Sequence, residues 1–100
     1  MHGDHGVTTH RHGSVLVIEV DGALGLIAAH DLRRAFLAAL GDTAGDPPGD
    51  LGLDLSSVSA VDVHGIAALH WCRDQAISHG RRLMWTGCSQ PLRRALALAA

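Results

Sequence analysis

The sequence predicts a small α/β fold built around a largely parallel sheet, and three observations predict it. Apolar runs typical of strands recur along the chain, segments with helical spacing separate them, and the connections between them are short. A parallel strand pair cannot be joined by a hairpin, so this alternation implies right-handed crossovers. A chain of 100 residues suits a single domain with one hydrophobic core.

The first twelve residues are polar and carry His2, His5, His10 and His12. We expect residues 1–12 to form a flexible, histidine-rich segment and residues 13–100 to form the folded domain. The part from Val7 to His12 is also compatible with an edge strand. Because the tract has no carboxylate or thiol partners in register, no metal site is predicted there.

Three elements are expected in the first half of the domain. The β-branched run Val15–Val20 predicts a central strand covered on both faces, ended by a turn at Asp21-Gly22. Ala28–Leu40 is predicted to be a helix that Gly41 ends, because its apolar residues recur at helical spacing: Ala29, Leu32, Phe36 and Ala39. The Gly/Pro/Asp segment 41–50 lacks the P-loop pattern, which indicates a mobile connector.

The second half centres on Leu51 to Ala76. Alternating Leu51, Leu53 and Leu55 predict a buried strand, and a serine-rich link, residues 56–59, follows it. Asp62 is a good N-cap residue, so residues 62–65 open a helix that ends at His79-Gly80. A further strand at 82–86 precedes a last helix, which Ser89 caps and in which Pro91 lies in the first turn.

Composition excludes several classes of protein. The net charge is −2, and the eight arginines, with no lysine, are scattered, so no basic stripe for nucleic acid is present. Cys72 and Cys88 have no zinc or CxxC spacing, which favours reduced thiols in a cytoplasmic protein. No apolar run approaches the ~20 residues that span a bilayer, so direct membrane insertion is not expected.

Several short motifs, in this order and spacing, resemble the STAS domain of anti-sigma factor antagonists. Val20-Asp21-Gly22-Ala23-Leu24-Gly25 is similar to the family's first turn, and Ser89-Gln90-Pro91-Leu92-Arg93-Arg94 is similar to its last helix start. Between them lie Asp54-Leu55-Ser56 and Val61-Asp62-x-x-Gly65-Ile66. The resemblance extends from Val15 onward and implies about four strands, with helices mainly on one face of the sheet.

The same resemblance bears on phosphorylation. Family members carry Asp-Ser-Ser-Gly or Asp-Ser-Thr-Gly at the turn, and a partner kinase phosphorylates the first hydroxyl. The alignment places Val63 at the acceptor position, and valine has no hydroxyl. The resemblance therefore implies a turn that is not phosphorylated there, and neither Ser59 nor His64 occupies the aligned position.

The helix after the turn predicts a surface for a partner. Counting about 100° per residue, an apolar arc faces the core and Trp71 points away from it. An outward tryptophan either lies across a neighbouring loop or anchors an interface. The arc comprises Ile66, Leu69, Cys72, Ala76 and Ile77, and the predicted partner-binding residues are Asp62, Val63, His64, Ala67, Ala68 and Trp71.

No motif indicates an enzyme, because the sequence has no nucleophile elbow and no HExxH pair. No cofactor is predicted. The resemblance implies a non-catalytic module that binds a GHKL-type anti-sigma kinase and so frees a sigma factor. Two alternatives stay open: a STAS subunit that braces the ATPase of an ABC transporter for membrane lipids, and a sensor that binds a nucleotide or another anion at the helix N-terminus.

Overall fold

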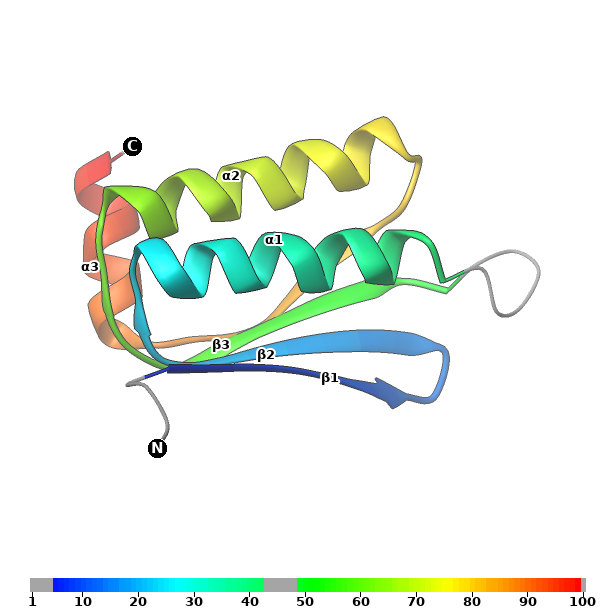
Figure 1. Ribbon diagram of the computed structural model, residues 1–100, viewed down its shortest axis with the longest axis horizontal. Coiled ribbons are helices and arrows are strands. Elements are labelled where there is room, and N and C mark those ends of the chain that lie inside the picture. The colour runs from blue at the N-terminus through cyan, green and yellow to red at the C-terminus, as the bar shows by residue number, and fades with distance from the viewer. Residues whose placement is uncertain (1–4, 43–48, 100) are drawn as a thin grey trace.

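The computed structural model describes residues 5–42 and 49–99, in which a four-stranded sheet carries its helices on one face (Figure 1). Two long helices, α1 and α2, lie side by side over the sheet, and α3 lies across one end. The elements are β1 (His5–His12), β2 (Val15–Leu24), α1 (Leu26–Leu40), β3 (Leu51–Val61), α2 (Val63–Ser78), β4 (Leu83–Cys88) and α3 (Gln90–Ala99).

The strands follow one another across the sheet in chain order, β1-β2-β3-β4. β1 and β2 form an antiparallel hairpin whose turn contains Gly13, with φ of 64°. β2, β3 and β4 are parallel, which confirms the predicted fold. The edge strand β1 therefore comes from the histidine-rich segment, and the boundary expected at residue 13 falls between two paired strands. Most of the predicted connector 41–50 lies outside the described residues.

Both central strands are longer than the sequence predicted. β2 continues to Leu24 through Gly22, whose φ of 87° accompanies a register shift against β3. β3 continues through the serines to Val61, because Val58 is buried between the exposed Ser57 and Ser59 and so extends the strand alternation. The predicted turn at Asp21-Gly22 and the predicted serine link are therefore wrong.

The core lies between the sheet and the two long helices. Ile18, Leu53, Phe36 and Leu69 are completely buried, as predicted for Leu53 and Leu69, but Ile66, expected in the same arc as Leu69, is only partly buried. β2 is covered by helices on one face only, so the prediction of cover on both faces is wrong. Fully excluded from solvent with the first four are Val20, Leu24, Ala29, Leu32, Leu51, Leu55, Ala68, Cys72 and Leu92.

Candidate functional site

The turn between β3 and α2 is held by Asp62, which acts as the N-cap, as predicted. Its Oδ1 accepts the backbone N–H of His64 at 2.9 Å and of Gly65 at 3.1 Å. Two N–H groups of the first turn of α2 are thereby satisfied within the chain. An anion at this position would meet a carboxylate already bound to those N–H groups, so the geometry gives no support to an anion sensor.

Glycines bring the start of α2 close to the end of β2. A Cβ at Gly65 would overlap the carbonyl oxygen of Leu24 and would lie 2.7 Å from Val61 Cγ2. A Cβ at Gly25, the residue before α1, would lie 3.3 Å from Asp62 Oδ2. Gly65 allows an approach that any side chain would block, and Gly25 allows a tight one, so the N-termini of α1 and α2 lie beside each other.

Three of the predicted partner-binding residues, together with Asp62, are accessible. Val63, His64 and Ala67 are exposed on the first turns of α2, and 75% of Val63 is accessible to solvent. Val63 and Ala67 border a groove of about 520 Å³ between α2 and α3. The other lining residues are mostly apolar: Val61, Ile66, Ala95 and Leu98 with Asp62 and His70.

The other two predicted residues lie elsewhere. Ala68 is completely buried, so it cannot belong to an accessible surface. The prediction that Trp71 points away from the core is also wrong, because its ring packs edge-to-face on Phe36 of α1 at a centroid distance of 6.2 Å. Ile77, expected in the core, is 69% exposed. The buried arc is rotated toward Ala68 because small residues let α2 approach its neighbours closely.

Sequence reasoning missed several exposed apolar residues at this end of the molecule. Leu26 and Ile27 begin α1, beside the turn, and both are largely exposed. Leu98 of α3 is 89% exposed. The sequence did carry a signal for Leu98. Helical spacing predicts an inward face formed by Leu92, Ala95, Leu96 and Ala99, and Leu98 does not belong to it. We call the surface formed by Leu26, Ile27, Val63, Ala67 and Leu98 the turn surface.

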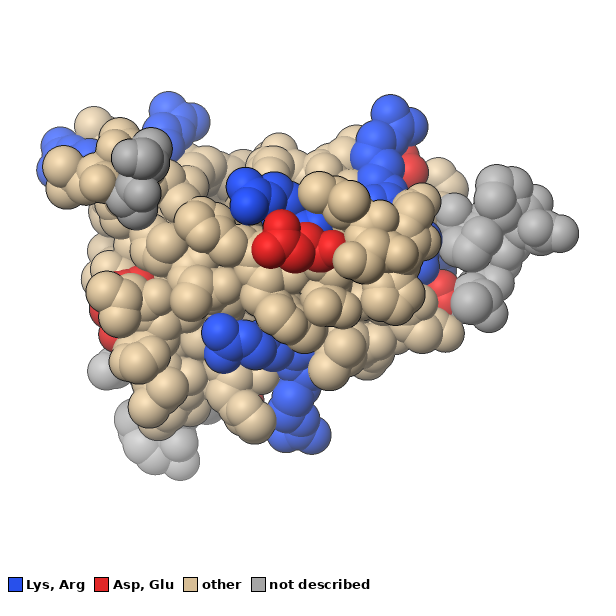
Figure 2. Space-filling view, turned by 90° about the horizontal axis from the view of Figure 1, so that it is seen from above, with Lys and Arg blue, Asp and Glu red and all other residues tan. Residues whose placement is uncertain are grey.

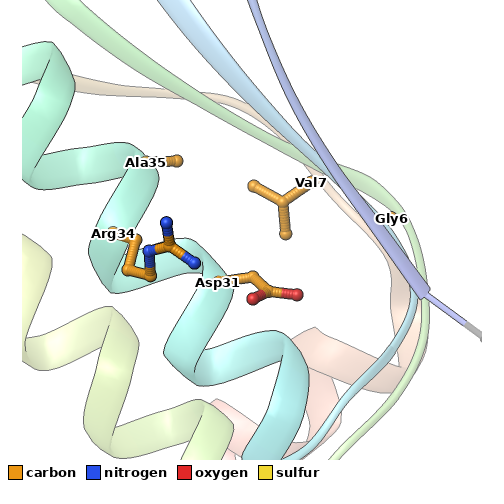
Figure 3. Close-up of a pocket in the computed structure, with 5 residues that line it drawn as sticks. All are labelled: Gly6, Val7, Asp31, Arg34 and Ala35. Atoms are coloured by element: carbon orange, nitrogen blue, oxygen red, sulfur yellow. The ribbon is translucent and has the colours of Figure 1, made fainter.

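A second hollow, of about 380 Å³, lies on the β1 side of α1 (Figure 3). The Val7 side chain from β1 faces Asp31 and Arg34 from α1 across it. Gly6 and Ala35 complete its lining. None of the residues that line this hollow belongs to the turn surface or to the groove between α2 and α3.

Charge is sparse over the helical face. Figure 2 shows isolated arginines and acidic residues separated by broad uncharged areas, and no continuous basic band crosses this face. The Ser56 hydroxyl, donating to Asp54 Oδ1 at 2.7 Å, and the Ser56 N–H hold the pKa of the Asp54 carboxyl below its usual value. Burial raises the pKa of the Cys72 thiol to about 12, which leaves that thiol un-ionised and unreactive.

Two further observations concern the described part of the chain. Within residues 5–42 and 49–99, no three histidine, cysteine or acidic side chains converge as metal ligands would. Over the same ranges, none of the helices has the length and apolar character that a bilayer crossing requires.

Comparison with known proteins identifies the fold and the family. The STAS domain family model described as "Mlab, STAS domain" matches residues 7–100. An anti-sigma factor antagonist from Mycobacterium paratuberculosis superposes with a TM-score of 0.78 at 22% identity, over 95% of this chain and 77% of that chain. No curated protein sequence matches this chain.

Two other solved structures share the fold. SpoIIAA, an anti-sigma factor antagonist in its unphosphorylated form, has a TM-score of 0.69 at 15% identity, over 93% of this chain and 83% of that chain. SLC26A9 has a TM-score of 0.63 at 19% identity, over 85% of this chain but 16% of that chain. The family match, which spans nearly the whole chain, decides the assignment: the protein belongs to the STAS domain family.

Proposed function

We propose that this protein is a non-catalytic, cytoplasmic interaction module that binds a GHKL-type anti-sigma factor through the turn surface and so frees a sigma factor. The observation that carries the proposal is the turn surface itself. Asp62 and Gly65 fix the backbone at the start of α2. Val63 on that turn and Leu98 on the neighbouring α3 are nevertheless largely exposed. Exposed apolar side chains on a rigid frame favour a protein partner.

The likeness to anti-sigma factor antagonists supports the choice of partner. Family membership and the folds of two such antagonists agree with it, and Asp62, Val63, His64 and Ala67 form the accessible part of the predicted contact. Trp71 is left with a packing role between α1 and α2, so the anchor of the contact shifts to Val63 and the groove beside it.

Val63 sets the mode of regulation in this proposal. An added phosphate would bring a charge of about −1.5 to −2 to an interface, but valine offers no hydroxyl to accept it. We infer that the kinase-like partner binds without modifying the turn. Release would then depend on the abundance of the protein or on competition for the partner.

A second candidate function is a STAS subunit that braces the ATPase of an ABC transporter for membrane lipids. It is favoured by the description of the matching family model, which names Mlab, and by the occurrence of the fold within SLC26A9. The same turn surface would serve as the contact. The two candidates therefore differ in the partner rather than in the site.

Affinity capture distinguishes these functions by the identity of the retained protein. The variant Val63→Asp tests whether the turn surface is the contact. Wild-type protein is expected to retain a GHKL-type kinase, and Val63→Asp is expected to weaken that binding at least about tenfold, because a charge would be desolvated at the contact. Leu37→Asp is the matched control, since Leu37 is also exposed but lies in the last turn of α1, far from the turn. Retention of an ABC ATPase instead would support the second candidate.

Phosphate incorporation tests the proposal that the partner does not phosphorylate the turn. Wild-type protein incubated with its kinase partner and ATP is expected to gain no phosphate, whereas Val63→Ser is expected to gain one at the turn. Mass spectrometry that finds phosphate on Ser59 or His64 of the wild-type protein would contradict the proposal.

A further inference from the structure

The two edges of the sheet differ in how they are protected. β1 carries the charged Arg11 together with His10 and His12, and all three are exposed. β4 reads Leu-Met-Trp-Thr-Gly-Cys, without a charged residue or proline. Charged side chains and proline are two means by which edge strands avoid pairing with other chains, and β4, which lacks both, relies on its short length and on the register shift beyond Trp85.

Backbone geometry identifies the groups that β4 offers. The N–H of Leu51 donates to the carbonyl of Arg82 at 2.9 Å, which fixes the alternation of the parallel ladder. In that alternation the peptide groups of Arg82 and Met84 face β3, and those of Leu83 and Trp85 face outward. β4 is the last strand in the described sheet, so this outer edge has no strand partner there.

Trp85 adds an apolar side chain to the same edge. Its Cα is in register with Leu53, so it lies on the face of the sheet that carries the helices. Even so, 45% of it is exposed, whereas Trp71 is packed against Phe36. The more accessible of the two tryptophans is therefore on the edge strand. Tryptophan is among the residues that most often anchor interfaces.

We propose that β4 pairs antiparallel with β4 of a second copy of this chain, joining two four-stranded sheets across a two-fold axis. With Met84 on the axis, the outward peptide groups of Leu83 in one copy meet those of Trp85 in the other. The Trp85 ring then lies beside Leu83 of the second copy, so both apolar side chains lose exposure. The helices of both copies stay on the same face of the joined sheet.

The charge that precedes β4 favours this arrangement. Arg82 is the charged residue next to the strand, and it pairs with Asp50 at 3.2 Å. In a parallel pairing the two copies of Arg82 would lie side by side, and like charges directly opposite each other are destabilising. In the antiparallel pairing Arg82 lies opposite the neutral Thr86. The strand is thus complementary to itself in the antiparallel sense.

The paired segment is short, because a register shift between Trp85 and Gly87 interrupts the ladder just beyond it. A small interface of this kind belongs to the weak, reversible class. The dimer is therefore expected to form at high micromolar concentration and to dissociate on dilution. It leaves the turn surface free, since no residue of β4 belongs to that surface.

Sedimentation velocity from about 5 µM to about 1 mM tests the pairing, a range chosen to bracket a weak interface. The wild-type sedimentation coefficient is expected to rise from the monomer value to the dimer value. Trp85→Lys, which adds the charge that edge strands normally use, is expected to raise the dissociation constant at least about tenfold. Ile77→Lys, which removes an exposed apolar side chain from α2, is the matched control and should dimerise like wild type.

Amide hydrogen exchange on the wild-type protein identifies the edge without any substitution. Protection of the Leu83 and Trp85 amides is expected to rise about tenfold between the dilute and the concentrated sample, while Met84 is protected in both. A monomer at every concentration would overturn the proposal and leave the β4 edge to a segment of another protein. Equal loss of dimer in Trp85→Lys and Ile77→Lys, or protection that does not change with concentration, would also overturn it.

Discussion

The two ends of the molecule are built in opposite ways. At the end where α1 finishes and β3 starts, Arg81 donates to the carbonyl of Gly49 at 2.8 and 3.1 Å and to that of Leu40 at 3.4 Å. Arg11 pairs with Asp42 at 2.6 Å, and Arg82 with Asp50 at 3.2 Å. We call this the arginine end, and polar side chains cover its loops.

The end that carries the turn surface has no comparable side-chain links within the described residues. Its side-chain hydrogen bonds are local, since the Asp62 carboxylate reaches only two and three residues ahead, whereas the side-chain bonds at the arginine end join residues 31 to 41 positions apart. Close backbone packing at Gly65 and one backbone hydrogen bond, from the Asp62 N–H to the Leu24 carbonyl at 3.3 Å, hold this end together. The turn end is thus closely packed but uncovered, and the arginine end is covered, which agrees with the proposal that binding belongs to the former.

Alanine in place of Gly65 is expected to give the largest effect. The new Cβ would overlap the Leu24 carbonyl oxygen, so α2 would have to shift, at a cost of about 3 kcal/mol in the free energy of unfolding. Gly41→Ala is the matched control, because its Cβ would meet the nearest atom at an ordinary 3.6 Å. Urea denaturation should show a loss within about 0.5 kcal/mol for that control. Similar losses for both variants would contradict the idea that the turn end depends on close packing.

Replacing Arg81 by methionine tests the arginine end. The variant removes charged donors from two part-buried carbonyl groups, and about 1.5–3 kcal/mol of stability should be lost. Arg82→Met removes an exposed ion pair and should cost no more than about 1 kcal/mol. Partner binding at the turn should be unchanged in both. If Arg81→Met abolished binding in a protein that stays folded, the separation of the two ends would be wrong.

This contrast also explains what the sequence could predict. Local signals were reliable: the Asp62 cap, the Ser89 cap, which accepts the Leu92 N–H at 3.3 Å, and the alternation of Leu51, Leu53 and Leu55 all form as expected. The links of Arg81 were not predictable, because its acceptors are backbone carbonyls that any residue supplies, brought close only by the fold.

The two tryptophans show the same limit at the candidate site. Whether Trp71 is exposed depends on Phe36, which belongs to another helix, and periodicity within α2 carries no information about that contact. Whether Trp85 is exposed depends on β4 lying at the edge of the sheet that the described residues form. Strand order is a property of the whole chain. The sequence therefore located the turn correctly but chose the wrong tryptophan as the accessible one.

Removing the Asp62 side chain should have a smaller effect than either change above. Asp62→Ala leaves the N–H groups of His64 and Gly65 without their acceptor and should cost about 1 kcal/mol. Asp62→Asn keeps a capping oxygen and should lie within a few tenths of a kcal/mol of wild type. Amide exchange should quicken at His64 and Gly65 in the alanine variant only. Unchanged exchange there would mean that packing alone holds the turn.

The smallest expected effect concerns Asp54, whose link to Ser56 is as local as the Asp62 cap but lies on the face of the sheet without helices. The Ser56 hydroxyl is the main cause of the lowered Asp54 pKa in the folded protein. A carboxyl whose pKa is lower folded than unfolded adds stability above the unfolded value, near pH 4, and that stability is lost as the pH falls through the folded value. Ser56→Ala should therefore be less stable than wild type at pH 7, and the difference should vanish as the pH is lowered past both pKa values.

NMR titration of the Asp54 carboxyl carbon measures the same link directly. The midpoint should rise in Ser56→Ala and should stay at the wild-type value in Ser57→Ala, because Ser57 is an exposed neighbour that makes no such bond to Asp54. An unchanged midpoint in Ser56→Ala would mean that the backbone N–H of residue 56, which the substitution leaves in place, is enough to stabilise the carboxylate. The local backbone alone would then hold the charged Asp54 carboxylate in place. Close backbone packing at Gly65 holds the start of α2 in a similar way.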